Sequence, residues 1–296
     1  MFTDPRGLYT LDEEVAAKLA GQRPVLVYQF DGFIDAGQTG RLFTAHVIEQ
    51  LEHEVLATFD HDQLHDYRSR RPVMIFDTNQ WKSYADLELR LYRVVDEHGE
   101  VFLLLTGPEP DTQWERMAAA VIGLVEQFGV RLSVNLHGIP MAVPHTRPVM
   151  LTAHSTDPGL VTGYRSWIDR VEVPGSFAGL LEFRLGQRER AALGFVAHVP
   201  HYLAQAAFPE ATLRLTRSLN AATGLAVPIE PLETASAETM NEIAAEMSGS
   251  SEVQELVATL EQQYDALAGA GESQMPSADE IAAEFEKFLA DREKDE

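Results

Sequence analysis

Cysteine is absent from this chain of 296 residues, which excludes disulfide bonds, thiolate metal sites and thiol catalysis. Basic residues are scarce: 23 Lys and Arg stand against 46 Asp and Glu, a net charge of -23. Such a field repels nucleic acid and anionic membrane surfaces, so we expect neither as a partner. No run approaches the ~18 apolar residues of a membrane span. The acidic start of the chain does not resemble a signal peptide, and we therefore expect a cytoplasmic protein.

The acidic charge is concentrated near the end of the chain. Residues 231–296 hold 17 acids and 3 bases, a net charge of -14, and the remainder carries -9. This shift predicts a boundary near Pro228–Pro231. We expect an α/β domain over residues 1–230 and an acidic helical segment over residues 231–296, packed on the core or on a neighbouring subunit.

Apolar runs alternate with helically spaced segments before that boundary. The runs predict strands at Val25–Phe30, Val55–Phe59, Val73–Phe76, Val101–Thr106, Leu132–Leu136, Val149–Ala153 and Phe195–Val199. The helical spacing predicts helices at Gly37–Leu51, Thr112–Phe128, Ser176–Arg188 and Ala211–Ala222. Two segments, His53–Arg71 and Gly138–Pro148, are expected to be exposed loops. The alternation predicts an α/β fold with a mostly parallel or mixed sheet and flanking helices.

Two further helices are predicted after the boundary. One apolar stripe is formed by Val253, Leu256, Val257, Leu260, Tyr264 and Leu267. A break is expected over Ala268–Pro276, and a capping-box pattern at Ser277 then begins the second helix. Both helices are acidic and too polar to form a core alone. We expect them to bury their apolar stripes on the sheet domain or on another subunit.

An acidic glycine turn follows the first predicted strand, in the sequence FDGFIDAG. Asp31 and Asp35 could serve there as metal ligands or general bases at a helix start. Alternatively, Gly32 and Gly37 relieve backbone strain and an Asp caps the helix. A phosphate site is disfavoured, because two carboxylates would repel the phosphate and neither GxxxxGK[ST] nor GxGxxG is present.

A second turn lies in the sequence LLTGPEPDTQW, where Gly107 and Pro108 end a predicted strand. Sites in open α/β sheets form at the carboxyl ends of strands, so Glu109 is expected at the same edge as Asp31 and Asp35. Three converging carboxylates could raise one pKa or hold a cation. The alternative is a rigid turn flanked by prolines.

Histidines follow two later strands. His145 and Arg147, in VPHTRPV, could bind an anion or pair with acids in a structural network. His201 and Tyr202, in VPHYL, also follow a strand, although a histidine there more often has a structural role. There is no HExxH motif and no GxSxG elbow. We expect no bound metal and no cofactor.

The ordered segments FDGFIDAG, DYRSRRP, LLTGPEPDTQW, VPHTRPV, AHVPHYL and IAAEFEKFL together resemble the PAC2 family, in its actinobacterial type. The resemblance spans roughly residues 20–290 and implies a fold similar to nucleoside phosphorylases and hydrolases with a C-terminal helical segment. It also implies kinship with proteasome assembly chaperones and a homo-oligomer, for example a trimer. Phe33 and Ile34 replace a common Trp, and the end, Arg292–Glu296, lacks the hydrophobic-Tyr-any tail of relatives that dock on proteasomes.

Three functions are therefore expected as alternatives. The first is a non-catalytic, protein-binding, assembly-chaperone-like homo-oligomer with a protein client. The second is a small-molecule hydrolase or carboxylate–amine ligase that uses a strand-end crevice, and the third is a metabolite-binding module in the same crevice. The candidate crevice residues are Asp31, Gly32, Phe33, Asp35, Gly37, Gly107, Glu109, Trp114, His145, Arg147, His201 and Tyr202.

Overall fold

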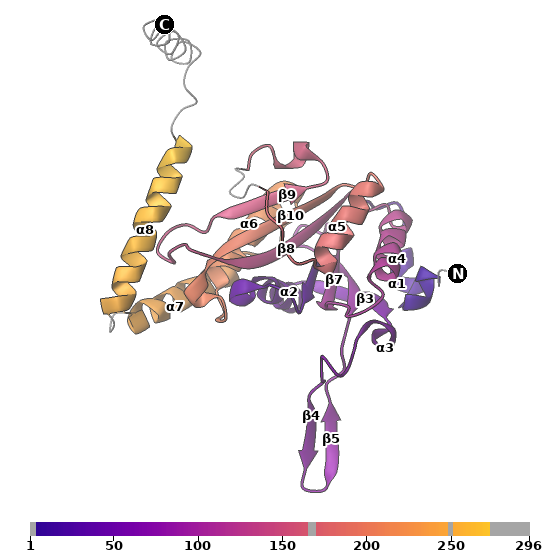
Figure 1. The fold of residues 1–296 in the computed structure, drawn as a ribbon. Coiled ribbons are helices and arrows are strands. Elements are labelled where there is room, and N and C mark those ends of the chain that lie inside the picture. Colours follow the sequence, from indigo (N-terminus) through magenta and orange to yellow (C-terminus); the bar gives the residue numbers. More distant parts are fainter. Residues whose placement is uncertain (1–3, 165–169, 248–250, 273–296) are drawn as a thin grey trace, which may run out of the picture.

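An eight-stranded mixed sheet forms the centre of the molecule (Figure 1). The computed structural model describes residues 4–164, 170–247 and 251–272. In spatial order the strands are β1 (Tyr9–Leu11), β3 (Glu52–Phe59), β6 (Arg90–Val95), β7 (Val101–Pro108), β2 (Val25–Asp31), β8 (Leu132–Met141), β10 (Ala192–Pro200) and β9 (Leu151–Ser155). The inner strands β7, β2, β8 and β10 run parallel to one another. The outer strands pair antiparallel.

Helices cover both faces of this sheet. Helices α4 and α5 pack on one face, and α2 and α6 pack on the other. The described helices are α1 (Glu13–Ala17), α2 (Thr39–Gln50), α3 (His61–Leu64), α4 (Trp114–Gln127), α5 (Phe177–Gln187), α6 (Pro209–Thr223), α7 (Glu230–Met247) and α8 (Ser251–Glu272). Short 3-10 turns occupy Pro5–Leu8, Ala36–Gln38, Pro158–Val161 and His201–Leu203. Among the described helices, none has the length and apolar character that a bilayer crossing requires.

Strand β2 contributes to two separate cores because its side chains alternate between the faces of the sheet. Tyr28 is fully buried in the core that α4 and α5 cover. Val27 is fully buried on the opposite face, in the core that includes Phe43 of α2 and Leu215 of α6. A strand buried on both faces has a near-continuous apolar sequence, which is why the run from residue 25 predicts it correctly.

Strands β4 (Met74–Asp77) and β5 (Gln80–Tyr84) form a separate antiparallel hairpin. Figure 1 shows it projecting away from the body of the molecule. The predicted strand Val73–Phe76 is therefore real but does not join the main sheet. The hairpin will be called the apolar hairpin, residues 73–84.

The C-terminal helices pack against the domain. Helix α7 lies on α6, where the Ser236 hydroxyl donates a 2.5 Å hydrogen bond to Glu210. Helix α8 is held by Arg147, whose guanidinium makes 2.9 Å ion pairs with Glu261 and Asp265. The acidic face of α8 is thus partly neutralised by one arginine from the loop after β8.

The predicted fold class, a mixed α/β sheet with flanking helices and a C-terminal helical segment, is confirmed. Both loop predictions are wrong in part. His53–Arg71 contains most of β3 and all of α3, and the start of Gly138–Pro148 belongs to β8. Strand β8 extends because β10 pairs with it as far as Met141. The sequence analysis did not predict β1, β5 or β6.

Two helices begin two residues later than predicted, for the same backbone reason. Gln38 has a φ of 53° and Gln113 a φ of 56°, so each stands in the left-handed region just before its helix. At the other end of the chain, α8 continues to Glu272, so the break predicted from Ala268 is wrong at its start. The helix predicted from Ser277 lies outside the described residues.

Gly107, the residue before the last of β7, has a φ of 145°, a conformation that L side chains rarely adopt. A Cβ atom there would overlap the carbonyl oxygen of Glu88 and the Cα of Leu89. We expect Gly107→Ala to lower the free energy of unfolding by about 3 kcal/mol or more, because backbone atoms must move. The measurement is urea denaturation. Gly123→Ala, at an open position of α4, is the control and should be neutral or slightly stabilising; equal stability of the two variants would contradict the prediction.

Candidate functional site

The turns after β2 and β7 lie side by side at one edge of the sheet. The two strands are parallel neighbours, with Asp31 opposite Pro108 in the register. The backbone N–H of Glu109 donates a 2.7 Å hydrogen bond to the carbonyl oxygen of Asp31. The carboxyl ends of the strands therefore bring the two acidic turns into direct contact.

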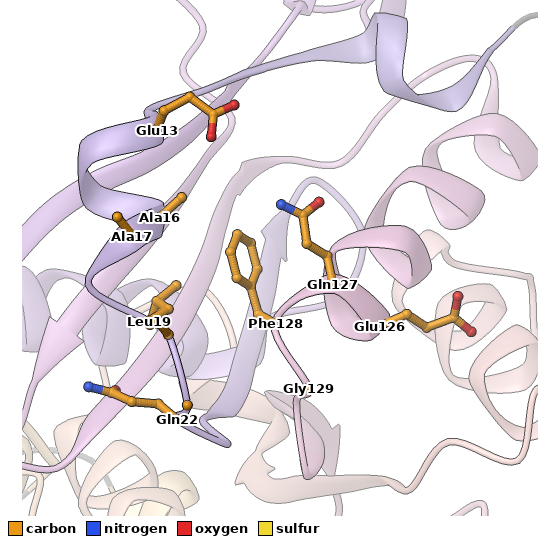
Figure 2. Close-up of a pocket in the computed structure, with 11 residues that line it drawn as sticks. Glu13, Ala16, Ala17, Leu19, Gln22, Glu126, Gln127, Phe128 and Gly129 are labelled. Carbon is orange, nitrogen blue, oxygen red and sulfur yellow. The ribbon is translucent and has the colours of Figure 1, made fainter.

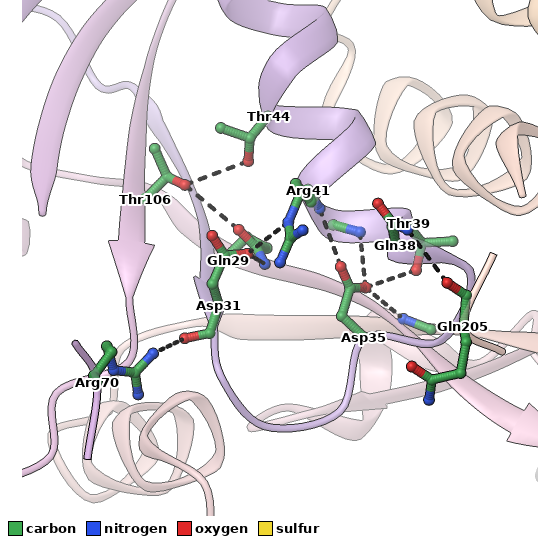
Figure 3. Close-up of polar contacts among 12 residues, drawn as sticks. Gln29, Asp31, Asp35, Gln38, Thr39, Arg41, Thr44, Arg70, Thr106 and Gln205 are labelled. Carbon is green, nitrogen blue, oxygen red and sulfur yellow. Dashed lines mark hydrogen bonds and ion pairs between the residues drawn. The ribbon is translucent and has the colours of Figure 1, made fainter. Parts of the chain in front are cut away.

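Asp35 caps the start of α2 (Figure 3). Its carboxylate accepts hydrogen bonds from the Thr39 hydroxyl at 2.8 Å, from the N–H of Gly40 at 2.9 Å and from the N–H of Arg41 at 3.1 Å. These N–H groups would otherwise lack partners in the first turn of the helix. The helix dipole also favours a negative charge at this end. The contacts of Asp35 are those of a structural cap.

Asp31 is also engaged in local contacts. Its carboxylate accepts a 3.2 Å hydrogen bond from the side-chain amide of Gln29 and lies 3.7 Å from the guanidinium of Arg41. Its backbone carbonyl accepts from Arg70 at 3.2 Å (Figure 3). Arg70 in turn pairs with Asp111 at 3.2 Å. Arg70 thus connects both turns, although its role was not apparent from the sequence.

Glu109 holds the start of another helix. Its Oε1 atom accepts a 2.6 Å hydrogen bond from the backbone N–H of Phe177, the first residue of α5. The Phe177 ring packs edge-on against Phe30 at 5.0 Å and lies 6.2 Å from the ring of Trp114. The predicted residues Glu109 and Trp114 thereby fix α5 against the end of the sheet.

Four of the predicted residues, His145, Arg147, His201 and Tyr202, follow strands β8 and β10. The Tyr202 hydroxyl is 2.8 Å from Nδ1 of His145 and accepts from the His145 N–H at 3.0 Å. Arg147 is committed to α8, and His201 is exposed. Within the described part of the chain, none of these four residues lines the cavity beside the acidic turns. The predicted residues therefore do not line one common crevice: those of the acidic turns are separate from those that follow β8 and β10.

A cavity of about 250 Å³ opens beside the acidic turns, between the sheet and α5. It will be called the α5 cavity. Among the predicted residues, Phe33 and Glu109 line it. The polar residues of its wall that sequence reasoning missed are Gln29, Asn135, His137, His154, Ser176 and Glu182. Two of them, Asn135 and His137, alternate with Val134 and Leu136 along β8. This alternation was the only feature of the sequence that could have placed the two polar side chains together on one face of the sheet.

The imidazole of His137 is held by Asn135. Its Nδ1 atom lies 3.0 Å from Oδ1 of Asn135, and the Asn135 amide nitrogen donates to the carbonyl of Tyr28 at 2.9 Å. Burial, together with the nearby His154, lowers the pKa of His137 to about 4. His137 is therefore neutral at physiological pH.

His154 lies over Gly194 of β10, where a side chain would collide with its ring. Its Nδ1 atom lies 2.8 Å from Oε1 of Glu182 on α5. A carboxylate paired with one imidazole nitrogen fixes the orientation of the ring. Across the described residues, however, no three His, Asp or Glu side chains are grouped so that they could hold a metal ion.

A second hollow, of about 480 Å³, lies at the opposite edge of the sheet (Figure 2). Its wall includes Leu19 and Gln22, just before β2, and Phe128, just before β8. It is thus at the amino ends of the central strands, where sites in open α/β sheets are not usually found. The α5 cavity is the better candidate.

Comparison with known proteins gives a family match and several similar structures. The model of the PAC2 family matches residues 29–247. A Mycobacterium tuberculosis protein of unknown function, Rv2714, is 43% identical, with 89% of this chain and 93% of that chain covered and a TM-score of 0.85. A Corynebacterium glutamicum protein of unknown function is 38% identical, with coverages of 88% and 97% and a TM-score of 0.82.

More distant similarity concerns the fold alone. A Mycobacterium tuberculosis protein described as a proteasome-assembly chaperone homologue, Rv2125, is 24% identical. The comparison covers 79% of this chain and 99% of that chain, with a TM-score of 0.71. No curated protein matches the chain.

The buried histidines predict a loss of stability in acid. Burial lowers the pKa of His198 to about 4, the same value as for His137. Unfolded histidine titrates near ~6.5, so the unfolded chain takes up protons first as the pH falls. The folded state therefore loses stability relative to the unfolded state as the pH falls, because it keeps His137 and His198 neutral. This loss begins near pH 6.5 and is complete near pH 4. Urea denaturation between these pH values should show the decline.

An NMR titration of the histidine ring resonances provides the direct check. The resonances of His137 and His198, assigned with single His→Gln variants, should stay at their neutral positions down to about pH 5. A midpoint near pH 6.5 for both rings would contradict the prediction.

Proposed function

The chain belongs to the PAC2 family, and on that basis we propose that it is a non-catalytic, protein-binding, assembly-chaperone-like protein that acts as a homo-oligomer. The observation that carries the proposal is the apolar hairpin, residues 73–84. Its large apolar side chains face solvent in the single chain: Val73, Met74, Ile75, Phe76, Trp81 and Tyr84.

A contiguous group of exposed, large apolar side chains is unusual on the surface of a monomeric protein. Trp81 is 64% exposed and its ring stacks edge-on with that of Phe76 at 5.0 Å, outside either core. An isolated two-stranded hairpin is at best marginally stable in water, and contiguous exposed apolar patches mark interaction sites. We propose that a second copy of the chain covers the hairpin.

The contacts of the acidic turns support a non-catalytic role. Asp35 accepts three short hydrogen bonds at the start of α2, and Glu109 accepts one at the start of α5. A general base needs a lone pair directed at its substrate. Carboxylates that serve as helix caps are poorly suited to that task, so the enzyme hypothesis loses its two leading residues.

The proposed client class comes from the more distant relative. Rv2125 is described as a proteasome-assembly chaperone homologue, and its chain shares this fold. We propose proteasome subunits as the first client class to test. The acidic field of the protein, with a net charge of -23, would favour a client with a basic surface.

Self-association should depend on the apolar hairpin. We expect an oligomer at micromolar concentration by light scattering, because a stable interface buries more than about 1,000 Å² and the hairpin supplies apolar area for it. The double variant Ile75→Lys/Trp81→Lys should shift the protein towards monomer. Val171→Lys, at a residue that is 59% exposed outside the hairpin, is the matched control and should leave the mass unchanged. A monomeric wild type would refute the role of the hairpin in self-association.

Client binding is tested separately. The wild type and the control variant, immobilised and exposed to purified proteasome α and β subunits, should retain at least one subunit type, detected by mass spectrometry. Denatured wild-type protein should retain none. Absence of retention by folded wild type, at concentrations where it is oligomeric, would remove the proteasome as the client and leave the self-association result standing.

A further inference from the structure

The α5 cavity contains polar groups that the assembly role does not use. His137, His154 and Glu182 line it, yet none of them belongs to the apolar hairpin or to either acidic turn. Glu182 has only 13% of its side chain exposed. A carboxylate that is largely removed from water is costly to desolvate, so its presence in a cavity beside two imidazoles calls for a specific explanation.

The hydrogen-bond directions in the floor of the cavity can be assigned. The carbonyl oxygen of Tyr28 can only accept, so the Asn135 group that faces it at 2.9 Å must be the NH₂. The Asn135 Oδ1 atom then faces Nδ1 of His137 and can only accept from it. The proton of the neutral His137 ring is therefore on Nδ1, and Nε2 presents a lone pair.

Two carboxylates add further acceptors to the wall. Glu182 can only accept, so Nδ1 of His154 carries a proton and donates to it. Glu182 and Glu109 each have one oxygen engaged and a second oxygen available.

The wall also includes Gln29, whose side-chain amide donates to Asp31, and the Ser176 hydroxyl. The two carboxylates and Nε2 of His137 therefore give the wall negative charge and directed lone pairs. Such a wall suits hydrogen-bond donors and cations and disfavours anions.

The remainder of the wall is apolar and partly aromatic. It comes from the turn after β2 and from the segment before α5, namely Phe30, Phe33, Ile34, Val173 and Pro174. A volume of about 250 Å³ is below the ~300–1,000 Å³ of drug-sized pockets and corresponds to roughly eight waters at liquid density. The ligand must therefore be small, with an apolar body and a compact head.

We propose that the α5 cavity binds a small primary amine, with its ammonium head between Glu182 and Nε2 of His137 and its apolar body against Phe33 and Ile34. The ammonium group supplies three N–H donors and no acceptor, which matches the polar wall. The Phe33 ring supplies apolar surface for the body of the ligand. The net charge of -23 raises the local concentration of cations around the protein. This proposal does not rest on the assembly role.

The test compares three ligands of similar shape and different head. Isothermal titration calorimetry on the full chain uses 2-phenylethylamine, 2-phenylethanol and phenylacetate as probes. The amine is expected to bind at least about ten-fold more tightly than the alcohol, which corresponds to about 1.4 kcal/mol. The acid should bind most weakly. Equal or tighter binding of the alcohol or the acid would overturn the proposal.

Variants then locate the head and the body of the ligand. Glu182→Gln should weaken binding of the amine at least about ten-fold and leave the alcohol nearly unchanged. Glu115→Gln, at a surface carboxylate on α4 that pairs with Arg184, is the matched control and should have no effect. Phe33 is 44% exposed, so Phe33→Ala should fold normally and, through lost apolar contact with the body of the ligand, weaken amine binding about two- to five-fold. Unchanged amine affinity in both cavity variants would overturn the assignment.

A lysine side chain of a protein client carries the same ammonium chemistry. Nα-acetyl-lysine methylamide therefore serves as a fourth probe. Weaker binding than that of 2-phenylethylamine supports a free small amine, whereas tighter binding would assign the cavity to a client side chain and overturn the proposal.

Discussion

The parallel pairing of β2 with both of its neighbours is the constraint on which the rest of the structure depends. Leu26 lies opposite Leu103 of β7 on one side and opposite Ser133 of β8 on the other. Because β2 is buried on both faces, a shift of one residue would move its apolar side chains to the wrong core. With the register fixed, the turns after β2 and β7 must emerge side by side, and the start of α5 can close over them.

The carboxylates of these turns hydrogen-bond to the first turns of two helices. Asp35 satisfies the first N–H groups of α2, and Glu109 does the same for α5, so each carboxylate anchors the helix that packs on its own side of the sheet. Negative charge at a helix start is favourable both through hydrogen bonds and through the helix dipole. The polar chemistry that remains available is in the α5 cavity, where His137 and His154 are held by Asn135 and Glu182.

Assembly and ligand binding would use different segments of the chain. The apolar hairpin is inserted between α3 and β6 and stands apart from the main sheet (Figure 1). The α5 cavity is built from strands β2, β8 and β9 and from α5. A variant in the apolar hairpin does not change any residue of the α5 cavity, and the reverse is also true. Each proposal can therefore be tested independently of the other.

The amino-acid sequence alone is sufficient to predict the layered α/β fold, because its apolar runs and helical spacing record local burial. It also predicts the two acidic turns, since Gly107 and the Asp31–Gly37 segment punctuate strand ends. The three-dimensional structure was needed to show that the run from Val73 forms an exposed hairpin, because a local apolar pattern does not say what covers it. It was also needed to show that Arg147 pairs with α8 and that His137 faces His154, because contacts between residues distant in the chain arise from strand order and register.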